Sequence, residues 1–489
     1  MAPVNHCVLY PTPWVRGIEE GLSGKKQLTL CCPDISVASI VATLKFGGKM
    51  KQILVLGAGL VARPLVRYLL AQEDIEVVLA DQLQSRADAL IEGHPSGRAI
   101  AMDVQDTAQL NDFVSRADIV VSLLPWNFHP KIAGLCLEHK KNLVTASYVK
   151  EEMQALDAAA KEKGLIFLNE VGVDPGIDHM AAMKTIDEIK AAGGEVTTFH
   201  SYCGGLPAMK NNNNPLGYKF SWSPEGALLA AGNDGRYLED GKVVDVPGCK
   251  LFEHYWLTDI PGSGVFEAYV NRDALPYLDL YGIPTAKNIY RGTLRNIGYC
   301  ETWDFFKKLG LMNQKMKFDM QETSPCQVIT NMIHSDGGDV QADVAAYLKI
   351  PKHSLTLKKL QWLGMFSHET LDLETVSVFE MFAHILKEKL TYNDGEVDLL
   401  LQHHEFVAQY PDGRQEMIMS TLMDTGTPGG DSSMSKTVGL PAAISARLIA
   451  EDKVDLKGVC IPVHSQIYKP VLAELAALNI KFVERKTLL

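Results

Sequence analysis

Residues 50–70 read MKQILVLGAGLVARPLVRYLL, and this stretch decides the fold of the first part of the chain. Residues 51–57 are almost wholly apolar, as is typical of a buried parallel strand. They lead directly into residues 57–62 (GAGLVA), which match the GxGxxG/A pattern of dinucleotide-binding turns. The first glycine suits a tight turn, and the second lets the backbone approach a pyrophosphate. The phosphates are expected over the free N–H groups where the following helix begins.

Four further apolar segments follow at regular spacing, separated by stretches with a helical pattern. We expect strands over residues 75–80, 99–106, 117–125 and 141–148. Strands that alternate with helices in this way predict a doubly wound parallel sheet of the Rossmann type, so the expected fold class is α/β. The alternative is an α/β domain whose nucleotide site is vestigial.

The residues expected to contact a cofactor lie in the glycine turn and after successive strands, because ligands bind beyond the carboxyl ends of such strands. Asp81 lies 24 positions after Gly57. A carboxylate there accepts hydrogen bonds from both ribose hydroxyls and repels a 2′-phosphate, so we expect NAD, while Arg86 nearby leaves NADP possible. The expected cofactor contacts are Gly57, Gly59, Leu60, Val61, Asp81, Asp103, Val104, Leu124, Ser147 and Tyr148.

Composition excludes several classes of function. The chain has 489 residues and a net charge of −12, which argues against a nucleic-acid partner but not against an anionic small molecule in a locally cationic pocket. No uninterrupted apolar run is long enough to span a bilayer. The nine cysteines include no CxxC pair, which predicts free thiols and a reducing, cytoplasmic location.

Residues 1–49 match neither a secretory signal nor a transit peptide. Their apolar part is interrupted by Pro33 and Asp34, and acidic residues precede it. We therefore expect Met50 to be the natural start and residues 1–49 to be an extension. The alternative is an extra hairpin packed on the domain surface.

The sequence pattern changes after the first predicted sheet. The first domain is expected over residues 50–175, completed by about 433–489, where a long amphipathic helix returns. Short β-type runs predict an α+β domain over residues 176–301 and 391–432. Leu, Met and Lys at helical spacing predict a small helical subdomain over residues 302–390.

A series of uncommon segments occurs in one order along the chain. They are LGAGLVARP, SLLPWNFHP, VTASYV, GVDPGIDHM, SYCGGLPA, NPLGYKFSWSP, VNRD, RGTLR and SKTVGLP. On these segments the chain resembles the saccharopine dehydrogenases that form L-glutamate, and the C-terminal half of aminoadipic semialdehyde synthase. The resemblance covers about residues 51–486 and is far more specific than the glycine pattern alone.

The resemblance implies reversible oxidation of saccharopine by NAD(P)⁺ and water to L-glutamate and 2-aminoadipate 6-semialdehyde, in lysine metabolism. It also implies a homodimer, and a second domain that both binds substrate and dimerises. The substrate contacts of the family fall on Pro125 and Trp126 and on Asn271, Arg272 and Asp273. A tyrosine usually follows the proline in this family, so any role of that hydroxyl has no direct counterpart at Trp126.

The implied substrate carries three carboxylates and therefore needs several cations. Arginine holds a carboxylate by two parallel hydrogen bonds, which lysine cannot do. Arg272 is the first candidate, while Arg291 and Arg295 are equally typical of structural ion pairs. The full set of candidate cations is Lys219, Arg272, Arg291, Arg295 and Lys436.

The reaction also needs a proton carrier, because the secondary amine must be neutral before hydride leaves. Free in water, such an amine has a pKa of about 10, so a base must assist. Candidates near the predicted site are His129, Asp174, Asp178, His179, Tyr202 and Cys203. We take Asp174, His179 and Tyr202 as the expected catalytic residues. Asp178 is equally explained as a helix cap. A helix cap explains His129 better than a catalytic role does, and a small packed side chain explains Cys203 better.

The adjacent His403 and His404 raise the question of a metal site. On either a helix or a strand, neighbouring side chains point in different directions, and no other ligand cluster accompanies them. We therefore predict no metal and a solvated face at these residues.

Two other functions remain open from the sequence. A carboxynorspermidine-type dehydrogenase performs analogous imine chemistry on a substrate with fewer carboxylates, and the VNRD and SKTVG segments favour saccharopine over it. A nucleotide-sensing protein without turnover is favoured only by Trp126.

Overall fold

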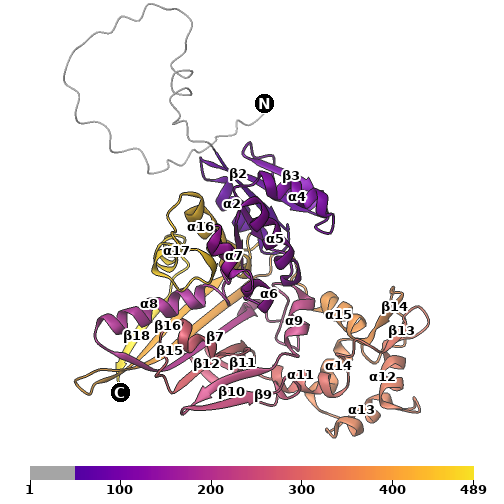
Figure 1. Ribbon diagram of the computed structural model, residues 1–489. Coiled ribbons are helices and arrows are strands. Elements are labelled where there is room, and N and C mark those ends of the chain that lie inside the picture. The colour runs from indigo at the N-terminus through magenta and orange to yellow at the C-terminus, as the bar shows by residue number, and fades with distance from the viewer. Residues whose placement is uncertain (1–49) are drawn as a thin grey trace, which may run out of the picture. The chain divides into compact units, whose positions relative to one another are not determined.

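The structure is a computed structural model that describes residues 50–489. The predictions made for residues 1–49 lie outside the described residues. The described elements form a parallel sheet, a larger mixed sheet and a group of helices, and Figure 1 shows the helices α11 to α15 gathered at one end.

A seven-stranded sheet organises the first part of the fold. Its strands run in the order β17-β6-β5-β4-β1-β2-β3, and every neighbouring pair is parallel. The strands are β1 (Lys51–Leu56), β2 (Ile75–Asp81), β3 (Gly97–Ala101), β4 (Ile119–Ser122), β5 (Asn142–Thr145), β6 (Ile166–Leu168) and β17 (Gly458–Cys460). The expected Rossmann-type fold is thus confirmed.

Helices cover both faces of this sheet. Ile53 and Val55 of β1 belong to one hydrophobic cluster, whereas Leu54 and Leu56 belong to another, so the strand is buried on both sides. The helices of this part are α2 (Ala62–Leu70), α3 (Gln84–Ile91), α4 (Thr107–Arg116), α5 (His129–His139), α6 (Glu151–Gln154) and α7 (Asp157–Glu162).

The third strand ends earlier than the sequence pattern indicates, at residue 101 rather than 106. Polar side chains terminate it. The Asp103 carboxylate accepts a hydrogen bond from the Gln105 N–H, and Asp106 caps α4 by accepting from two backbone N–H groups. Carboxylates that bond the local backbone favour turns and helix starts over strands.

The second sheet is mixed. Its main strands run in the order β10-β11-β12-β7-β15-β16-β18, with a hairpin of β8 and β9 attached to β12. Only the pair β12 and β7 is parallel. The strands are β7 (Glu195–Pro207), β8 (Gly235–Glu239), β9 (Lys242–Val246), β10 (Tyr255–Ile260), β11 (Gly264–Val270), β12 (Asn288–Arg295), β15 (Asp398–Gln409), β16 (Gln415–Thr425) and β18 (Val483–Leu488).

Helix α8 (Ile177–Ala191) packs against β7 and β15 of the second sheet. The last part of the chain contacts both sheets. Helix α16 (Ser433–Ala450) packs on α2, and β17 extends the first sheet, whereas β18 pairs with β16 of the second. Helix α17 (Ser465–Ala477) packs on α8.

The helical part lies between β12 and β15 in the sequence. It contains α11 (Tyr299–Lys308), α12 (Pro325–Ile333), α13 (Val340–Leu348), α14 (Leu355–Trp362) and α15 (Val378–Lys389), with a hairpin of β13 (Lys317–Asp319) and β14 (Thr375–Ser377). Shorter elements are α9 (Pro224–Ala230), α10 (Pro276–Leu280) and the single turns η1 (Trp126–Phe128), η2 (Met209–Asn211) and η3 (Gly248–Lys250).

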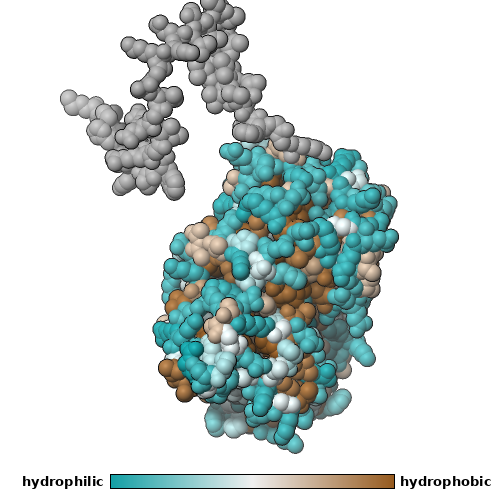
Figure 2. Space-filling model, turned by 60° about the vertical axis from the view of Figure 1, so that its left-hand side comes forward, coloured by the Kyte–Doolittle hydropathy of each residue, from teal (hydrophilic) through white to brown (hydrophobic). Residues whose placement is uncertain are grey.

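One face of the described part is mainly polar. Figure 2 shows one face on which hydrophilic side chains predominate and hydrophobic ones gather in a broken band along its middle. Within residues 50–489, none of the helices combines the length and the apolar character needed to cross a membrane.

Candidate active site

A short irregular segment joins the first sheet to α8 and brings polar side chains to one place. Glu170 adopts a φ of 59°, which is uncommon for a residue other than glycine. Gly176 has a φ of 148°, and a Cβ added there would lie 2.0 Å from the carbonyl oxygen of Gly172. Only glycine fits this turn, which places Asp174 just before α8 and Asp178 in its first turn.

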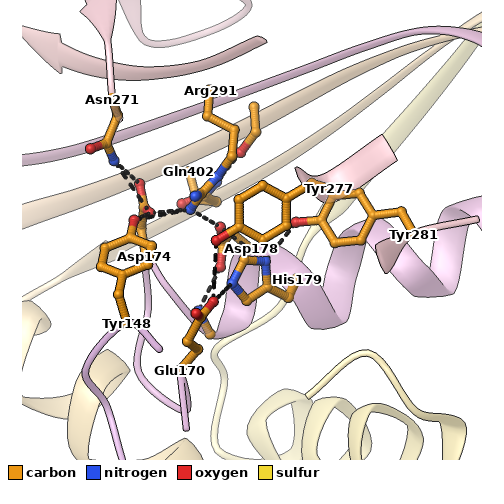
Figure 3. A network of polar contacts seen from close by, with 12 residues as sticks. Tyr148, Glu170, Asp174, Asp178, His179, Asn271, Tyr277, Tyr281, Arg291 and Gln402 are labelled. Carbon is orange, nitrogen blue, oxygen red and sulfur yellow. Dashed lines mark hydrogen bonds and ion pairs between the residues drawn. The ribbon is translucent and has the colours of Figure 1, made fainter. Parts of the chain in front are cut away.

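The guanidinium of Arg291, on β12, holds both of these carboxylates. Its Nη2 lies 2.6 Å from Asp174 Oδ1 and 2.7 Å from Asp178 Oδ2. The Tyr148 hydroxyl donates to Asp174 Oδ1 at 2.9 Å, and Asn271 Nδ2 donates to Asp174 Oδ2 at 3.2 Å. Figure 3 shows both carboxylates turned toward the end of the Arg291 side chain. One cation therefore serves two acids.

The two carboxyl groups differ in their affinity for a proton. Burial raises the pKa of Asp174, and the positive charge of Arg291 offsets only part of that rise. Burial acts on Asp178 in the same direction, but its neighbours His179 and Arg291 and the Gly176 N–H bring its pKa below the usual value. Paired acids whose environments separate their pKa values are typical of acid–base chemistry. The side chain of Asp174 is 10% exposed against 1% for Asp178, so Asp174 is the more accessible acid of the pair.

His179 lies behind Asp178 and is fully buried. Its Nε2 is 2.8 Å from Glu170 Oε2, and its Nδ1 is 2.6 Å from the Tyr281 hydroxyl. The Tyr277 hydroxyl donates to the same Glu170 oxygen at 3.2 Å. Because both ring nitrogens are engaged, His179 orients its neighbours in this geometry.

Glu170 is the central residue that the sequence reasoning missed. Its second oxygen, Oε1, accepts the Val149 N–H at 3.0 Å, so it ties the loop after β5 to His179. Its position directly after a buried parallel strand was the available signal, since ligand sites form at the carboxyl ends of such strands.

Tyr202, the third expected catalytic residue, is not brought to this cluster. In the parallel pairing of β12 with β7, Arg291 lies beside Ser201 and Gly292 beside Tyr202. Side chains alternate between the two faces of a sheet, so Tyr202 and Arg291 point to opposite faces. The Tyr202 ring stacks on His403, with ring centroids 6.3 Å apart.

Two other candidates occupy structural positions. Cys203 shares the Arg291 face of the sheet and is buried, and burial raises the pKa of its thiol well above the usual value. His129 begins α5 and is also buried, with Nε2 2.8 Å from the Ser147 hydroxyl. Burial lowers the pKa of His129 to about 4.

The prediction of a solvated face at His403 and His404 is wrong. Both side chains are fully buried, because their strand β15 lies inside the second sheet between β7 and β16. They do point in different directions, as expected: His403 Nδ1 is 2.7 Å from the Thr421 hydroxyl, whereas His404 contacts Gln402. Burial lowers the pKa of His404 to about 3. No cluster of three or more potential metal ligands occurs within residues 50–489.

The glycine turn has the shape that a dinucleotide requires. Gly57 has a φ of 102°, and a Cβ added to Gly59 would meet no atom within 4 Å, so the backbone is open on that side. The Asp81 carboxylate, at the end of β2, accepts the Ala58 N–H and the Leu83 N–H, both at 2.9 Å. It therefore lies against the turn and presents a negative charge there.

The other expected cofactor residues lie around this turn or at neighbouring strand ends. The Leu124 side chain approaches Gly57, and Leu60 is 65% exposed where α2 begins. Asp103 and Val104 follow β3, and the carbonyl of Val104 accepts a hydrogen bond from Lys131 at 2.8 Å. Ser147 and Tyr148 follow β5, and Val61 is the residue before α2.

Among the expected cations, most are already paired. Lys219 forms an ion pair with Glu396, and Lys436 lies 2.9 Å from an Asp424 oxygen. Arg295 is buried among tyrosine rings, with its guanidinium carbon 5.0 Å from the centroid of Tyr218.

The segment from Asn271 to Asp273 differs from these sites. Arg272 has a φ of 62°, and its guanidinium lies 4.7 Å from the centroid of the Tyr148 ring. No carboxylate of the described chain forms an ion pair with it. Asp273 points elsewhere, with Oδ2 3.9 Å from Arg236.

The glycine turn, Tyr148 and Asp174 follow β1, β5 and β6, so all three lie at one edge of the first sheet. A nucleotide turn beside a buried carboxyl group of raised pKa at this edge defines a dinucleotide-dependent oxidoreductase.

Comparisons with known proteins specify the class. Residues 53–168 match the saccharopine dehydrogenase NADP binding domain, and residues 172–480 match the saccharopine dehydrogenase C-terminal domain. The chain is 36% identical over 445 residues to the NADP(+)-dependent, L-glutamate-forming saccharopine dehydrogenase of Schizosaccharomyces pombe, covering 89% of this chain and 99% of that one. It belongs to the saccharopine dehydrogenase family.

Two further relatives agree with this assignment. The bovine mitochondrial alpha-aminoadipic semialdehyde synthase is 34% identical over 90% of this chain, which spans 48% of that longer protein. The solved structure of apo saccharopine dehydrogenase (L-Glu forming) from Saccharomyces cerevisiae matches with a TM-score of 0.81 at 34% identity, covering 89% of this chain and all of that one.

Proposed function

We propose that this chain oxidises saccharopine at the carbon next to its secondary amine. Hydride passes to the nicotinamide of NAD(P)⁺, and water then cleaves the resulting imine to L-glutamate and 2-aminoadipate 6-semialdehyde, with release of one proton. The observation that carries the proposal is Asp174, a carboxyl of raised pKa held by Tyr148, Asn271 and Arg291 in a member of this family.

Asp174 takes the proton of the substrate ammonium, which frees the nitrogen lone pair that assists hydride departure. It next assists the attack of water on the imine and returns a proton to the departing amine of glutamate. Burial raises the pKa of Tyr148 well above its usual value, so its hydroxyl remains a donor toward Asp174. His179 acts as a positioning residue through Asp178 and Glu170.

The substrate is held at the segments that follow β4 and β11. Pro125 and Trp126 follow β4, and Asn271, Arg272 and Asp273 follow β11. Arg272 supplies a guanidinium for one carboxylate, and the support for this role is that it lies over the ring of Tyr148, whose hydroxyl donates to Asp174.

The test is the appearance of reduced nicotinamide when purified protein meets L-saccharopine, with NAD⁺ and NADP⁺ in parallel. We expect turnover with saccharopine and none above background with carboxynorspermidine. Turnover with the polyamine alone would replace the substrate assignment. A folded protein that binds nucleotide but turns over neither substrate would instead be a sensor.

For the cofactor, we propose NAD in preference to NADP. The support is Asp81, whose carboxylate lies against the glycine turn where the adenosine ribose is expected. The names of the fungal relatives specify NADP(+), so this chain is proposed to differ from them. A preference for NADP⁺ in the assay would leave the proposed reaction unchanged. It would indicate that Arg86, and not Asp81, decides which nucleotide is bound.

Replacing Asp81 with asparagine is expected to raise the ratio of kcat/KM for NADP⁺ to that for NAD⁺ by about tenfold or more. Two like charges about 4 Å apart near a protein surface repel by roughly 4 kcal/mol, and about 1.4 kcal/mol equals tenfold. The exposed Asp88 on α3 supplies a control, because Asp88→Asn changes net charge equally. A ratio within twofold of the wild-type value in Asp81→Asn would contradict the proposal.

We further propose a homodimer in a reducing compartment such as the cytoplasm. The face of the second sheet that carries Tyr202 has a hollow lined in part by Met419, Met423 and Val483, which suits contact with a second copy. The six cysteines within residues 50–489 are free thiols, as a reducing compartment favours. Light scattering of the purified protein measures the mass, and a monomer would contradict the proposed assembly.

A further inference from the structure

Trp126 and Lys150 form a pair at the edge of the first sheet. They lie on the segments that follow the neighbouring strands β4 and β5. The ammonium nitrogen of Lys150 lies 5.6 Å from the centroid of the Trp126 ring, within the range of a cation–π interaction. Trp126 is 53% exposed and Lys150 is exposed, so both are open to a ligand.

The charges around the proposed site leave few cations free to hold a carboxylate. Arg291 is occupied by Asp174 and Asp178. Within residues 50–489, Lys150 and Arg272 each lie beside the loop after β5 without a carboxylate in ion-pair contact.

The loop after β5 is next to both free cations, Arg272 and Lys150. Arg272 lies over the ring of Tyr148, and Lys150 follows two positions later and lies over Trp126. An aromatic face supports a cation from one side and leaves its remaining N–H groups available to an acceptor. The site thus presents two cations, each backed by an aromatic ring.

We propose that Lys150, supported by Trp126, binds a carboxylate of saccharopine and thereby sets specificity for an acidic substrate. The proposal rests on the function proposed above and adds a residue to it. A tyrosine at position 126 would offer its hydroxyl, whereas tryptophan offers a larger ring, and the ammonium of Lys150 supplies the polar contact. The departure from the family pattern at Trp126 and the free charge of Lys150 then have one explanation.

Replacing Lys150 with methionine tests the role, because methionine keeps an unbranched apolar stem and removes the charge. We expect KM for saccharopine to rise about tenfold to a hundredfold, as for the loss of one charged hydrogen bond, while KM for the nucleotide stays unchanged. Lys150→Arg should restore KM to within about threefold, since it keeps a cation that stacks on aromatic rings.

The matched control is Lys163→Met. Lys163 is exposed at the end of α7, before β6, and so lies at the opposite edge of the first sheet. It should leave both KM values unchanged. Trp126→Leu should raise KM for saccharopine in the same direction as Lys150→Met, because the ammonium loses its support.

The reverse reaction identifies the carboxylate involved. A rise in KM for L-glutamate in Lys150→Met assigns the contact to the glutamate half, and a rise for the semialdehyde assigns it to the other half. A KM for saccharopine within twofold of wild type in Lys150→Met overturns the inference and makes the pair a surface contact.

A calorimetric measurement of saccharopine binding distinguishes failure of the Lys150 inference from failure of the proposed function. Wild-type protein that binds saccharopine without oxidising it contradicts the function alone, and the Lys150 variants are then compared by affinity. Wild-type protein that does not bind it contradicts both.

Discussion

Asp174→Asn is expected to lower kcat for saccharopine oxidation by about a hundredfold to ten-thousandfold, the range contributed by a general acid–base group. Asparagine fills the same space and keeps an oxygen that accepts from Tyr148, but it cannot take the ammonium proton. Measurement of kcat at saturating saccharopine and nucleotide checks this result.

The pH profile supplies a second readout of the same role. Burial raises the pKa of Asp174, so the wild-type kcat/KM should fall as the pH drops through that raised value and the base becomes protonated. In Asp174→Asn, the part of the fall of kcat/KM at acidic pH that comes from this carboxyl group should be absent. The exposed Asp279 on α10 supplies the control, since Asp279→Asn should retain wild-type kcat. A kcat within fivefold of wild type in Asp174→Asn would show that Asp174 is not the acid–base group of the reaction.

Arg291→Met is expected to lower the free energy of unfolding by about 3–5 kcal/mol, the cost of removing one partner from a buried ion pair. The change leaves Asp174 and Asp178 side by side without their shared cation, in a region where Arg291 itself is 1% exposed. Denaturation by urea at neutral pH, followed by the fluorescence of buried tryptophan, measures the loss.

Two companion variants separate charge from packing. Arg291→Lys keeps the charge but loses the planar guanidinium, which lies 4.6 Å from the centroid of the Tyr277 ring, so it should fall between wild type and Arg291→Met. The triple variant Arg291→Met with Asp174→Asn and Asp178→Asn removes the uncompensated charges and should recover part of the lost stability. A loss below about 1 kcal/mol in Arg291→Met, the scale of an exposed pair, would contradict the account of the cluster as a buried ion-pair centre.

The parts of the fold that follow local rules were predictable from the sequence. The glycine turn at 57–62 and the apolar strand before it belong to one contiguous segment, and the structure places α2 directly after them. The pairing of Asp174 with Arg291 was not predictable, because it joins residues more than a hundred positions apart through the register of β12 against β7.

The missed and misplaced residues share that cause. Tyr202 and Cys203 are adjacent in sequence, yet the strand alternation sends only Cys203 to the face that carries Arg291. Whether a polar strand such as that of His403 is solvated depends on its neighbours in the sheet, and those neighbours come from distant parts of the chain. Glu170 lies in a segment of irregular backbone, where neither helical nor strand periodicity draws attention to it.

The completion of the first sheet by β17 has a consequence for the order in which the protein is made. Leu168 of β6 pairs with Cys460, and between them the chain builds the helical part and every strand of the second sheet except β18. During synthesis β6 therefore stays an unpaired edge of the first sheet until residues 458–460 have left the ribosome. An unpaired edge is a template for aggregation, so β17 covers this edge of the sheet only after the helical part and most of the second sheet have been made.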